Sequence, residues 1–175
     1  MSEILAEIVQ NEEDTQHGKF LTFALGEEVY GIEIKFVTEV VVMQKISDIP
    51  ESPNYVKGII NLRGKIIPVI DMRLKLKKDS TQYTGRTCIV VIDIQALIFG
   101  LIVDNVDEVI MIPDTSIVPP PSYKTGFQNR YIKGIGKVNE EVRLLIDCEC
   151  FFKNDELQAV SQTSESHMTS CQISF

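Results

Sequence analysis

The sequence lacks tryptophan and has only two histidines and few alanines. Alanine is the strongest helix former, so its scarcity argues against long helices. The many Val and Ile residues instead favour strands, because β-branched side chains lose rotamer freedom in a helix but pack well on a pleated sheet. Hydrophobic residues make up 44% of the 175 residues, which suffices for a core. The composition therefore predicts an all-β globular protein.

Positive charge is also scarce, since the formal net charge is −8. Phosphate binding needs a cationic surface, so nucleic acid is not an expected partner. No apolar run approaches the roughly 20 residues that a membrane-spanning helix needs. The first residues, Met1 to Glu7, are acidic, whereas a signal peptide begins with basic residues. We therefore expect a cytoplasmic protein without direct membrane insertion.

Catalytic and metal-binding patterns are missing as well. The sequence has no Walker loop, dinucleotide fingerprint or Gly-x-Ser-x-Gly elbow, and both histidines, His17 and His167, lie in or beside expected tails. The cysteines show neither a Cys-x-x-Cys spacing nor a nearby His, which favours core or surface thiols over a metal site: Cys88, Cys148, Cys150 and Cys171. We expect no catalytic residues, metal or cofactor.

An internal repeat organises the chain. Residues 55–71 align without a gap with residues 131–147, at a spacing of 76, and match at Tyr, Lys, Gly, Ile, Ile and Asp. Residues 30–40 similarly match residues 99–109, at a spacing of 69, so about seven residues were added in the loop at 119–130. Each repeat predicts about five short strands, and the need to cover every strand edge favours a closed or nearly closed barrel.

The repeat and the composition suggest domain boundaries. Residues 1–16 are expected to form a flexible N-terminal arm. Residues 17–152 are expected to form the folded domain, with barrel lobes at about 19–78 and 86–150. Residues 153–175 are rich in Ser, Thr and Gln, which is typical of a disordered tail.

Several polar residues have competing interpretations. Asp71 and Asp147 end equivalent strands, where Asp commonly accepts hydrogen bonds from nearby backbone amides. Asp104 is expected at a solvated strand or turn position. Pro68 predicts an edge or barrel-rim strand, because proline cannot donate to a ladder. Arg63 is either an exposed charge at a hairpin tip, of little consequence for stability, or an interface residue.

Four segments together resemble the CheW family of chemotaxis coupling proteins. The resemblance covers roughly residues 19–152 and is carried by residues 23–32 (Phe-Ala-Leu-Gly-Glu-Glu-Val-Tyr-Gly-Ile), 37–40 (Val-Thr-Glu-Val), 55–73 and 100–106. It implies two similar five-stranded SH3-like barrels packed together, with short helical turns. It also implies a non-enzymatic adaptor that couples chemoreceptor cytoplasmic tips to the regulatory domain of the histidine kinase CheA, in arrays at the inner face of the membrane.

The resemblance carries roles over to particular residues. Val37, Glu39, Gly58 and Arg63 match positions associated with binding receptor or kinase, and the receptor groove of the family lies between the lobes. A further kinase contact, which closes rings, maps to residues 119–123 and involves Tyr123. Val118 and Ser122 stand where relatives often have charged residues, which makes this contact more apolar or weaker in this chain.

Two alternatives remain open from the sequence. A small-ligand sensor or an enzyme could use the cleft between the lobes, although no cluster of convergent titratable residues supports this. A scaffold of a non-chemotactic signalling system would have the same sequence features.

Overall fold

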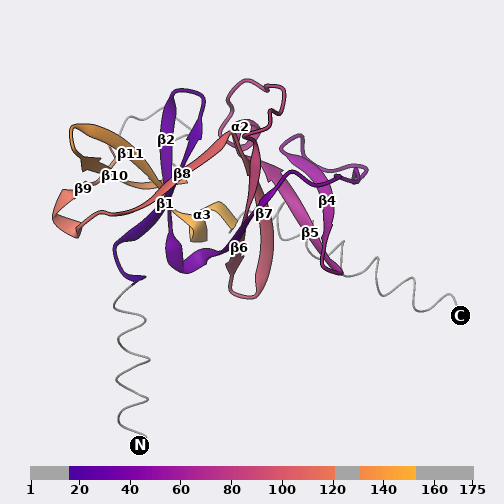
Figure 1. Cartoon of the computed structure of the whole chain (residues 1–175), viewed down its shortest axis with the longest axis horizontal. Coiled ribbons are helices and arrows are strands. Elements are labelled where there is room, and N and C mark those ends of the chain that lie inside the picture. The colour runs from indigo at the N-terminus through magenta and orange to yellow at the C-terminus, as the bar shows by residue number, and fades with distance from the viewer. Residues whose placement is uncertain (1–15, 121–130, 153–175) are drawn as a thin grey trace, which may run out of the picture.

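Strands β1 to β11 form two sheets that lie side by side (Figure 1). The computed structural model describes residues 16–120 and 131–152. The expected N-terminal arm, except for residue 16, and the expected tail lie outside the described residues. The mostly β architecture, with two sheets and only short helices, confirms the predicted fold class.

The elements follow the chain in the order that the repeat predicts. The strands are β1 (Lys19–Leu25), β2 (Glu28–Glu33), β3 (Val37–Val42), β4 (Val56–Leu62), β5 (Lys65–Asp71), β6 (Cys88–Ile94), β7 (Leu97–Val103), β8 (Asn105–Met111), β9 (Ile117–Val118), β10 (Ile132–Val138) and β11 (Glu141–Ile146). The helices are η1 (Ile34–Phe36), α2 (Met72–Lys75), η2 (Asp114–Ser116) and α3 (Cys148–Phe152). Among the described residues, none of the helices is long and apolar enough to cross a membrane.

The two sheets do not follow the two repeats. One sheet has the strand order β8-β1-β2-β11-β10-β9, and the other has the order β3-β6-β7-β5-β4. Each sheet therefore combines strands from both halves of the chain, so the predicted lobe boundaries, 19–78 and 86–150, are wrong as a description of the sheets. The repeats correspond to strands, but not to lobes.

The reason is an exchange of hairpins between the repeats. The closing hairpin of each repeat pairs in parallel with the opening hairpin of the other: Leu145 lies opposite Gly31 in one sheet, and Val69 lies opposite Gly100 in the other. The strands between the hairpins also cross over, since β3 pairs with β6 and β8 pairs with β1. Each sheet is complete only with a part of the other repeat.

One strand required a correction to its predicted position. Pro68 does not lie on an edge strand, because β5 pairs with β4 on one side and with β7 on the other. The pairing of β5 with β7 begins only at Val69. The missing N–H of Pro68 therefore falls just before that parallel ladder, where no bond to β7 is made.

The largest buried cluster lies between the sheets rather than inside either one. Equivalent strands supply equivalent side chains to it: Leu21, Phe23 and Leu25 from β1, and Val90, Ile92 and Ile94 from β6. Two smaller clusters fill the individual barrels. Because each apolar face is buried mainly against the other lobe, the two sheets share one core.

A buried lysine lies where the two repeats meet. The Lys75 side chain comes from α2 and is only 6% exposed. Its Nζ lies 4.1 Å from the ring centroid of Tyr55, 5.1 Å from that of Tyr131 and 5.4 Å from that of Phe151. The first two rings are the repeated tyrosines of the sequence pattern. The electron-rich ring faces stabilise the ammonium group and join the two repeats.

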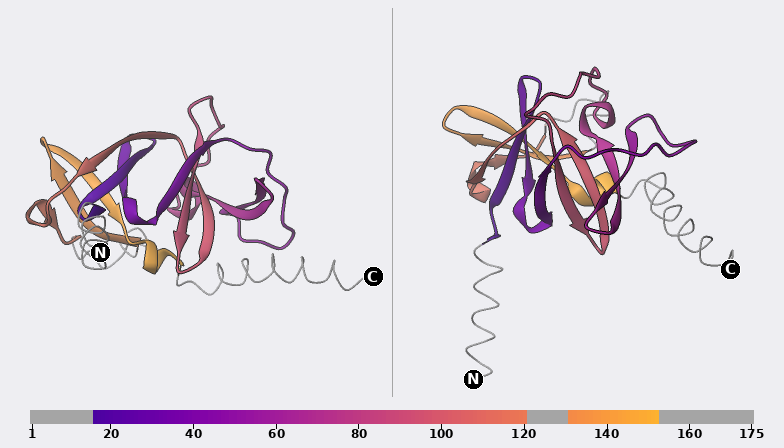
Figure 2. Two further views of the ribbon diagram at one scale, coloured as in Figure 1. Left: turned by 60° about the horizontal axis from the view of Figure 1, so that its bottom comes forward. Right: turned by 45° about the vertical axis from the view of Figure 1, so that its right-hand side comes forward.

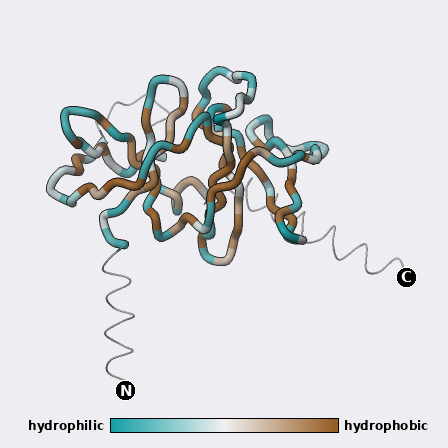
Figure 3. The backbone as a smooth tube through the Cα atoms, viewed as in Figure 1, coloured by the Kyte–Doolittle hydropathy of each residue, from teal (hydrophilic) through white to brown (hydrophobic). Residues whose placement is uncertain are grey.

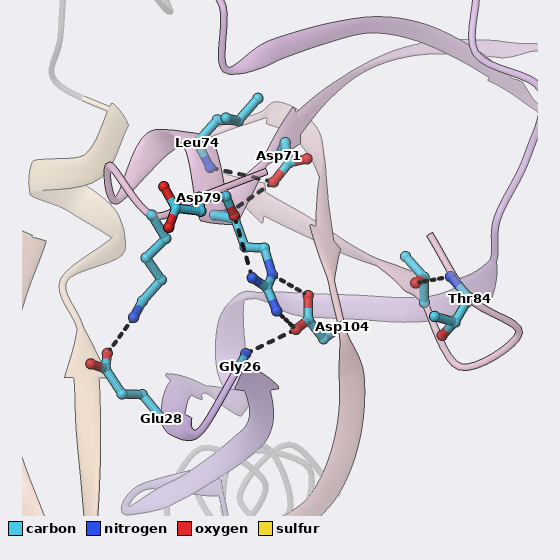
Figure 4. A network of polar contacts seen from close by, with 10 residues as sticks. Gly26, Glu28, Asp71, Leu74, Asp79, Thr84 and Asp104 are labelled. Atoms are coloured by element: carbon cyan, nitrogen blue, oxygen red, sulfur yellow. Dashed lines mark hydrogen bonds and ion pairs between the residues drawn. The ribbon is translucent and has the colours of Figure 1, made fainter. Parts of the chain in front are cut away.

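A polar network also joins the lobes (Figure 4). The Arg73 guanidinium, on α2, pairs with both carboxylate oxygens of Asp104, which follows β7. The same carboxylate accepts a hydrogen bond of 2.8 Å from the backbone N–H of Gly26, in the β1–β2 turn. Asp104 was expected to be solvated, and this prediction is wrong, because its side chain is 27% exposed and bridges both sheets.

The network predicts a specific loss of stability in acid. Arg73 and the Gly26 amide lower the pKa of Asp104 below its usual value. A lowered folded-state pKa contributes stability that is present above the unfolded-state pKa and is lost as the pH falls through the folded-state pKa. Asp104→Asn should therefore cost about 1–3 kcal/mol at neutral pH, and this difference should shrink in acid.

Urea unfolding at a series of pH values measures this difference. The exposed Asp107 provides the matched control, since Asp107→Asn should shift the free energy of unfolding by a small and nearly constant amount. If the Asp104→Asn protein and the unsubstituted protein lost stability in parallel between neutral pH and acid, the Asp104 carboxylate would not stabilise the contact between the lobes.

Candidate functional site

The hairpin tip between β4 and β5 presents Arg63 in a tight turn. Arg63 has a φ of 52° and Gly64 a φ of 85°, so both residues of this two-residue loop are left-handed, as in a type I′ turn. The Asn61 side chain accepts a hydrogen bond of 2.9 Å from the Gly64 N–H. This bond braces the turn, and the backbone that carries Arg63 is thereby well defined.

Arg63 and Glu39 form a two-pronged ion pair. The Arg63 Nη1 and Nη2 atoms lie 3.2 and 2.8 Å from the two Glu39 carboxylate oxygens. The Arg63 side chain is 75% exposed and that of Glu39 is 28% exposed. Because such exposed pairs contribute only about 0–1 kcal/mol to stability, the pair is better suited to recognition than to holding the fold.

The ion pair also spans the two edges of one sheet. Glu39 lies on β3 and Arg63 follows β4, and these strands are the two ends of the five-stranded sheet. A short backbone bridge also joins Ser47, which follows β3, to Ile59 on β4, with N to O distances of 2.9 and 2.8 Å. The backbone bridge closes the barrel, and the exposed ion pair lies across the same opening.

The second repeat has the same turn without the ion pair. Asn139 and Glu140, between β10 and β11, also have positive φ values, of 51° and 66°. The positions of Arg63 and Glu39 correspond to Asn139 and Glu108, which cannot form an ion pair with each other. The pair therefore marks one lobe only, and an asymmetric feature in a repeated fold is a candidate for function.

Two other predicted site residues, Gly58 and Val37, lie at packed positions of the fold. Gly58 is buried, and a Cβ built there would lie 2.0 Å from the Ser47 carbonyl oxygen. Val37 is half-buried and packs against the core between the sheets. The structure therefore brings Glu39 and Arg63 together, while Val37 and Gly58 shape the scaffold beside them.

Apolar side chains are exposed on β3 and on its counterpart, β8. The β3 strand alternates, so that Val37, Glu39 and Val41 are half-buried, whereas Val40 and Val42 are 42% and 74% exposed. On β8, the exposed apolar residues are Val109 and Met111. We call Val40, Val42, Val109 and Met111 the apolar strip.

β3 lies at an edge of the five-stranded sheet and β8 at an edge of the six-stranded sheet, and the two sheets lie side by side (Figures 1 and 2). The tube coloured by hydropathy has brown segments on both (Figure 3). Exposed aliphatic side chains of this size on two edge strands make the apolar strip a candidate interaction surface. The apolar strip was not predicted from the sequence, although the alternation of residues 37–42 contains a signal for it.

The predicted ring contact is only partly described. Tyr123 lies outside the described residues, as do Ser122 and most of the loop. Val118, on β9, is described and is 52% exposed. Its strand pairs with β10 at the edge of the six-stranded sheet. The role of Tyr123 stays a prediction.

The titratable residues near the strand ends have structural roles. The Asp71 carboxylate accepts hydrogen bonds from the N–H groups of Arg73 and Leu74 and from the Tyr83 hydroxyl, and the Asp147 carboxylate accepts one from the Cys150 N–H. The prediction that these carboxylates accept hydrogen bonds from nearby backbone amides is therefore confirmed. Each of these aspartates lies just before a short helix, and its carboxylate already accepts hydrogen bonds from nearby donors.

The three described cysteines are thiols that lie in the core or towards the surface. Burial raises the pKa of Cys148 to about 12, so that this thiol stays protonated at neutral pH. Cys88 is half-buried and Cys150 is exposed. Cys148 and Cys150 both lie on α3. Among residues 16–120 and 131–152, His, Cys, Asp and Glu form no cluster suited to a metal ion.

Comparisons with known proteins agree on one family. The model of the CheW-like domain matches residues 19–156. The chain is 32% identical over 154 residues to the chemotaxis protein CheW of Klebsiella aerogenes, covering 88% of this chain and 93% of that protein. It is 33% identical over 147 residues to CheW of Treponema pallidum, covering 82% and 86% of the two chains.

A solved structure agrees with both. The scaffolding protein TtCheW from Thermoanaerobacter tengcongensis superposes with a TM-score of 0.71 and is 40% identical, covering 77% of this chain and 87% of that one. The family match spans both sheets, the apolar strip and the Arg63–Glu39 pair. The chain therefore belongs to the CheW family of chemotaxis coupling proteins, whose members act as adaptors in chemotaxis signalling.

Proposed function

We propose that this protein couples the cytoplasmic tips of chemoreceptors to the regulatory domain of the histidine kinase CheA. The observation that carries the proposal is the Arg63–Glu39 pair beside β3, which is present in one lobe only. In this proposal the protein binds both partners at once and makes or breaks no covalent bond.

The receptor contact is assigned to the apolar strip and the ion pair together. Burial of exposed aliphatic side chains such as Val42 and Met111 supplies most of the affinity, at about 25 cal/mol for each Å² of apolar surface removed from water. The exposed guanidinium of Arg63 supplies orientation, since its planar donors match a carboxylate or a backbone carbonyl of the partner. Glu39 holds the guanidinium ready for this contact.

The kinase is assigned to further surfaces, including the loop that follows Val118. Tyr123 is proposed as an aromatic contact in this loop, and the exposed Val118 as an apolar contact on β9. Because Val118 and Ser122 are uncharged, we expect this contact to depend less on salt than a contact between charged residues would. The protein would then act at arrays on the cytoplasmic face of the membrane.

The shared core suggests how receptor state reaches the kinase. The largest buried cluster joins the two sheets, and so do Lys75 and the hydrogen bond from the Gly26 N–H to Asp104. A displacement of the receptor against the apolar strip would therefore move both sheets together. We expect the receptor to change the position of the kinase relative to the array rather than the fold of the adaptor.

Calorimetry with a receptor cytoplasmic fragment and with the isolated kinase regulatory domain tests the proposal. Arg63→Gln should weaken receptor binding about tenfold, because it removes the charged, forked donor. Arg86→Gln, at another exposed arginine, is the matched control and should bind like the unsubstituted protein. Unchanged receptor affinity for a folded Arg63→Gln protein would contradict the proposed role of Arg63, and the absence of binding to either partner would contradict the proposed function itself.

A further inference from the structure

The two repeats of the chain contact each other through equivalent surfaces. We call residues 19–78 the first repeat and residues 86–152 the second repeat. Strand pairings across the contact come in matched sets, in which each residue is replaced by its counterpart from the other repeat: Val69–Gly100 with Leu145–Gly31, and Val40–Val90 with Val109–Leu21. Because a contact with this two-fold geometry is self-complementary, two copies of the same repeat could build it as well.

One pair of positions in this contact carries opposite charges in the two repeats. At the spacing of 76 residues, which continues from the aligned hairpins into α2 and α3, Arg73 corresponds to Glu149. At the spacing of 69 residues, Lys35 corresponds to Asp104. The counterpart of the pair Arg73–Asp104 is therefore Glu149 with Lys35. Both cations belong to the first repeat, and both carboxylates belong to the second.

The distribution of these charges favours contact between unlike repeats. Arg73 Nε lies 2.8 Å from a carboxylate oxygen of Asp104. Lys35 and Glu149 share a neighbourhood, since burial is the main cause of the raised pKa of Cys148 but the charges of both residues also act on that thiol. If two first repeats met, Arg73 of each copy would face Lys35 of the other. Two second repeats would bring Asp104 against Glu149, and like charges so placed repel each other.

Lys75 adds a buried charge at the centre of the same contact. Its counterpart at the spacing of 76 residues is Phe151, and the Lys75 Nζ lies only 5.4 Å from the ring centroid of Phe151. The two repeated tyrosines, Tyr55 and Tyr131, also contact this ammonium group. In a pair of first repeats, a second Lys75 would replace Phe151. Two ammonium groups would then share one buried site, which is unfavourable for both.

The other ion pairs at the contact do not distinguish like from unlike repeats. Among the described residues, Lys133 pairs with Glu33 across the contact, but the counterpart of Lys133 is Lys57, which has the same charge. Glu28 and Lys78 both belong to the first repeat, so their pair would persist in either arrangement. The discrimination therefore depends on positions 35, 73, 75, 104 and 149.

We propose that these charges make the contact selective, so that each repeat accepts the other repeat and rejects a second copy of itself. The exchange of hairpins creates the need for selectivity, because each sheet is completed by strands of another repeat. Repulsion in the wrong complex contributes to such selectivity as much as attraction in the right one. The protein is thereby held to one lobe with the Arg63–Glu39 pair and one lobe without it. The inference does not depend on the proposed receptor and kinase contacts.

Refolding of the full-length protein with exchanged charges tests the inference. Arg73→Glu gives position 73 the residue of position 149, and Asp104→Lys gives position 104 the residue of position 35. The double variant keeps opposite charges at positions 73 and 104, but each repeat now carries both signs and can pair with its own copy. After refolding at about 1 mM, where a second chain competes with the linked repeat, its dimer fraction should exceed that of the unsubstituted protein about tenfold. Size-exclusion chromatography with light scattering measures this fraction.

Two further variants complete the test. Arg86→Glu with Asp107→Lys is the matched control, because it makes the same changes at exposed positions and should leave the dimer fraction unchanged. Lys75→Met removes the buried charge with little change of length, keeps the Arg73–Asp104 pair and should raise the dimer fraction about threefold.

Cross-linking of mixed isotope-labelled and unlabelled chains identifies the contact in the dimers. Lysines of the first repeat in one chain should be joined to lysines of the first repeat in the other. A dimer fraction that stays at the unsubstituted level in both the exchanged variant and Lys75→Met would overturn the inference. So would cross-links between chains that join only first repeats to second repeats, because the dimer would then be an ordinary exchange of native partners.

Discussion

Replacing Gly58 by alanine is expected to cost more stability than any other single methyl addition at the hairpin of β4 and β5. Gly58 has a φ of 145°, and the new Cβ would lie 2.0 Å from the Ser47 carbonyl oxygen and 2.8 Å from its carbon. These are backbone atoms of the Ser47–Ile59 bridge, so they cannot rotate away. We expect a loss of at least about 3 kcal/mol, or failure to fold.

Gly64→Ala is the matched control, on the same hairpin. Gly64 also has a positive φ, of 85°, but a Cβ there would have no heavy atom within 4 Å. Its cost should be only the backbone strain of a non-glycine residue, about 1–2 kcal/mol. Chemical denaturation measures both. If the two variants lost the same stability, the contact with Ser47 would not be the reason for a glycine at position 58.

Placing aspartate at Val42 and Met111 together is expected to lower receptor affinity at least a hundredfold while leaving the fold intact. Both side chains are more than half exposed, at 74% and 62%, so the free protein loses little by the change. A bound partner would instead have to bury two carboxylates without counter-charges, which costs several kcal/mol in all. Calorimetry with the receptor fragment gives the affinity, and thermal unfolding gives the stability.

Val142→Asp is the control for this double substitution. Val142 is 54% exposed, but it lies on β11, outside the apolar strip. It should bind the receptor fragment with unchanged affinity. An equal loss of affinity from Val142→Asp would show that added negative charge, rather than the place of the substitution, weakens binding.

The strands were predictable from the sequence because the repeat reflects a pattern of residues that are close together in the chain. The two Tyr-x-Lys-Gly segments locate equivalent hairpins, and both proved to be paired strands, β4–β5 and β10–β11. The exchange of hairpins could not be predicted in this way. An alignment of two repeats is the same whether each hairpin pairs within its own repeat or with the other. The two cases are distinguished by strand pairings such as Gly31 with Leu145 and Gly100 with Val69.

The candidate site was predictable in part for a similar reason. Glu39 and Arg63 were singled out separately, but their pairing depends on closure of the barrel between β3 and β4, which no local pattern encodes. Asp104 was misjudged because its partner, Arg73, is 31 residues away and is brought close only by the pairing of β5 with β7. Val40 and Val42 were within reach of sequence reasoning, since their strand alternates with a period of two.

The central claim is that the apolar strip and Arg63 together receive the receptor. Two-dimensional NMR of the full-length protein, titrated with a receptor cytoplasmic fragment, tests it most directly. We predict that the backbone amide signals of β3, β8 and the turn at Arg63 and Gly64 shift first and most strongly, and that Arg63→Gln weakens the titration. Shifts confined to β10 and β11, around the exposed Val142, with β3 and β8 unaffected, would contradict the claim.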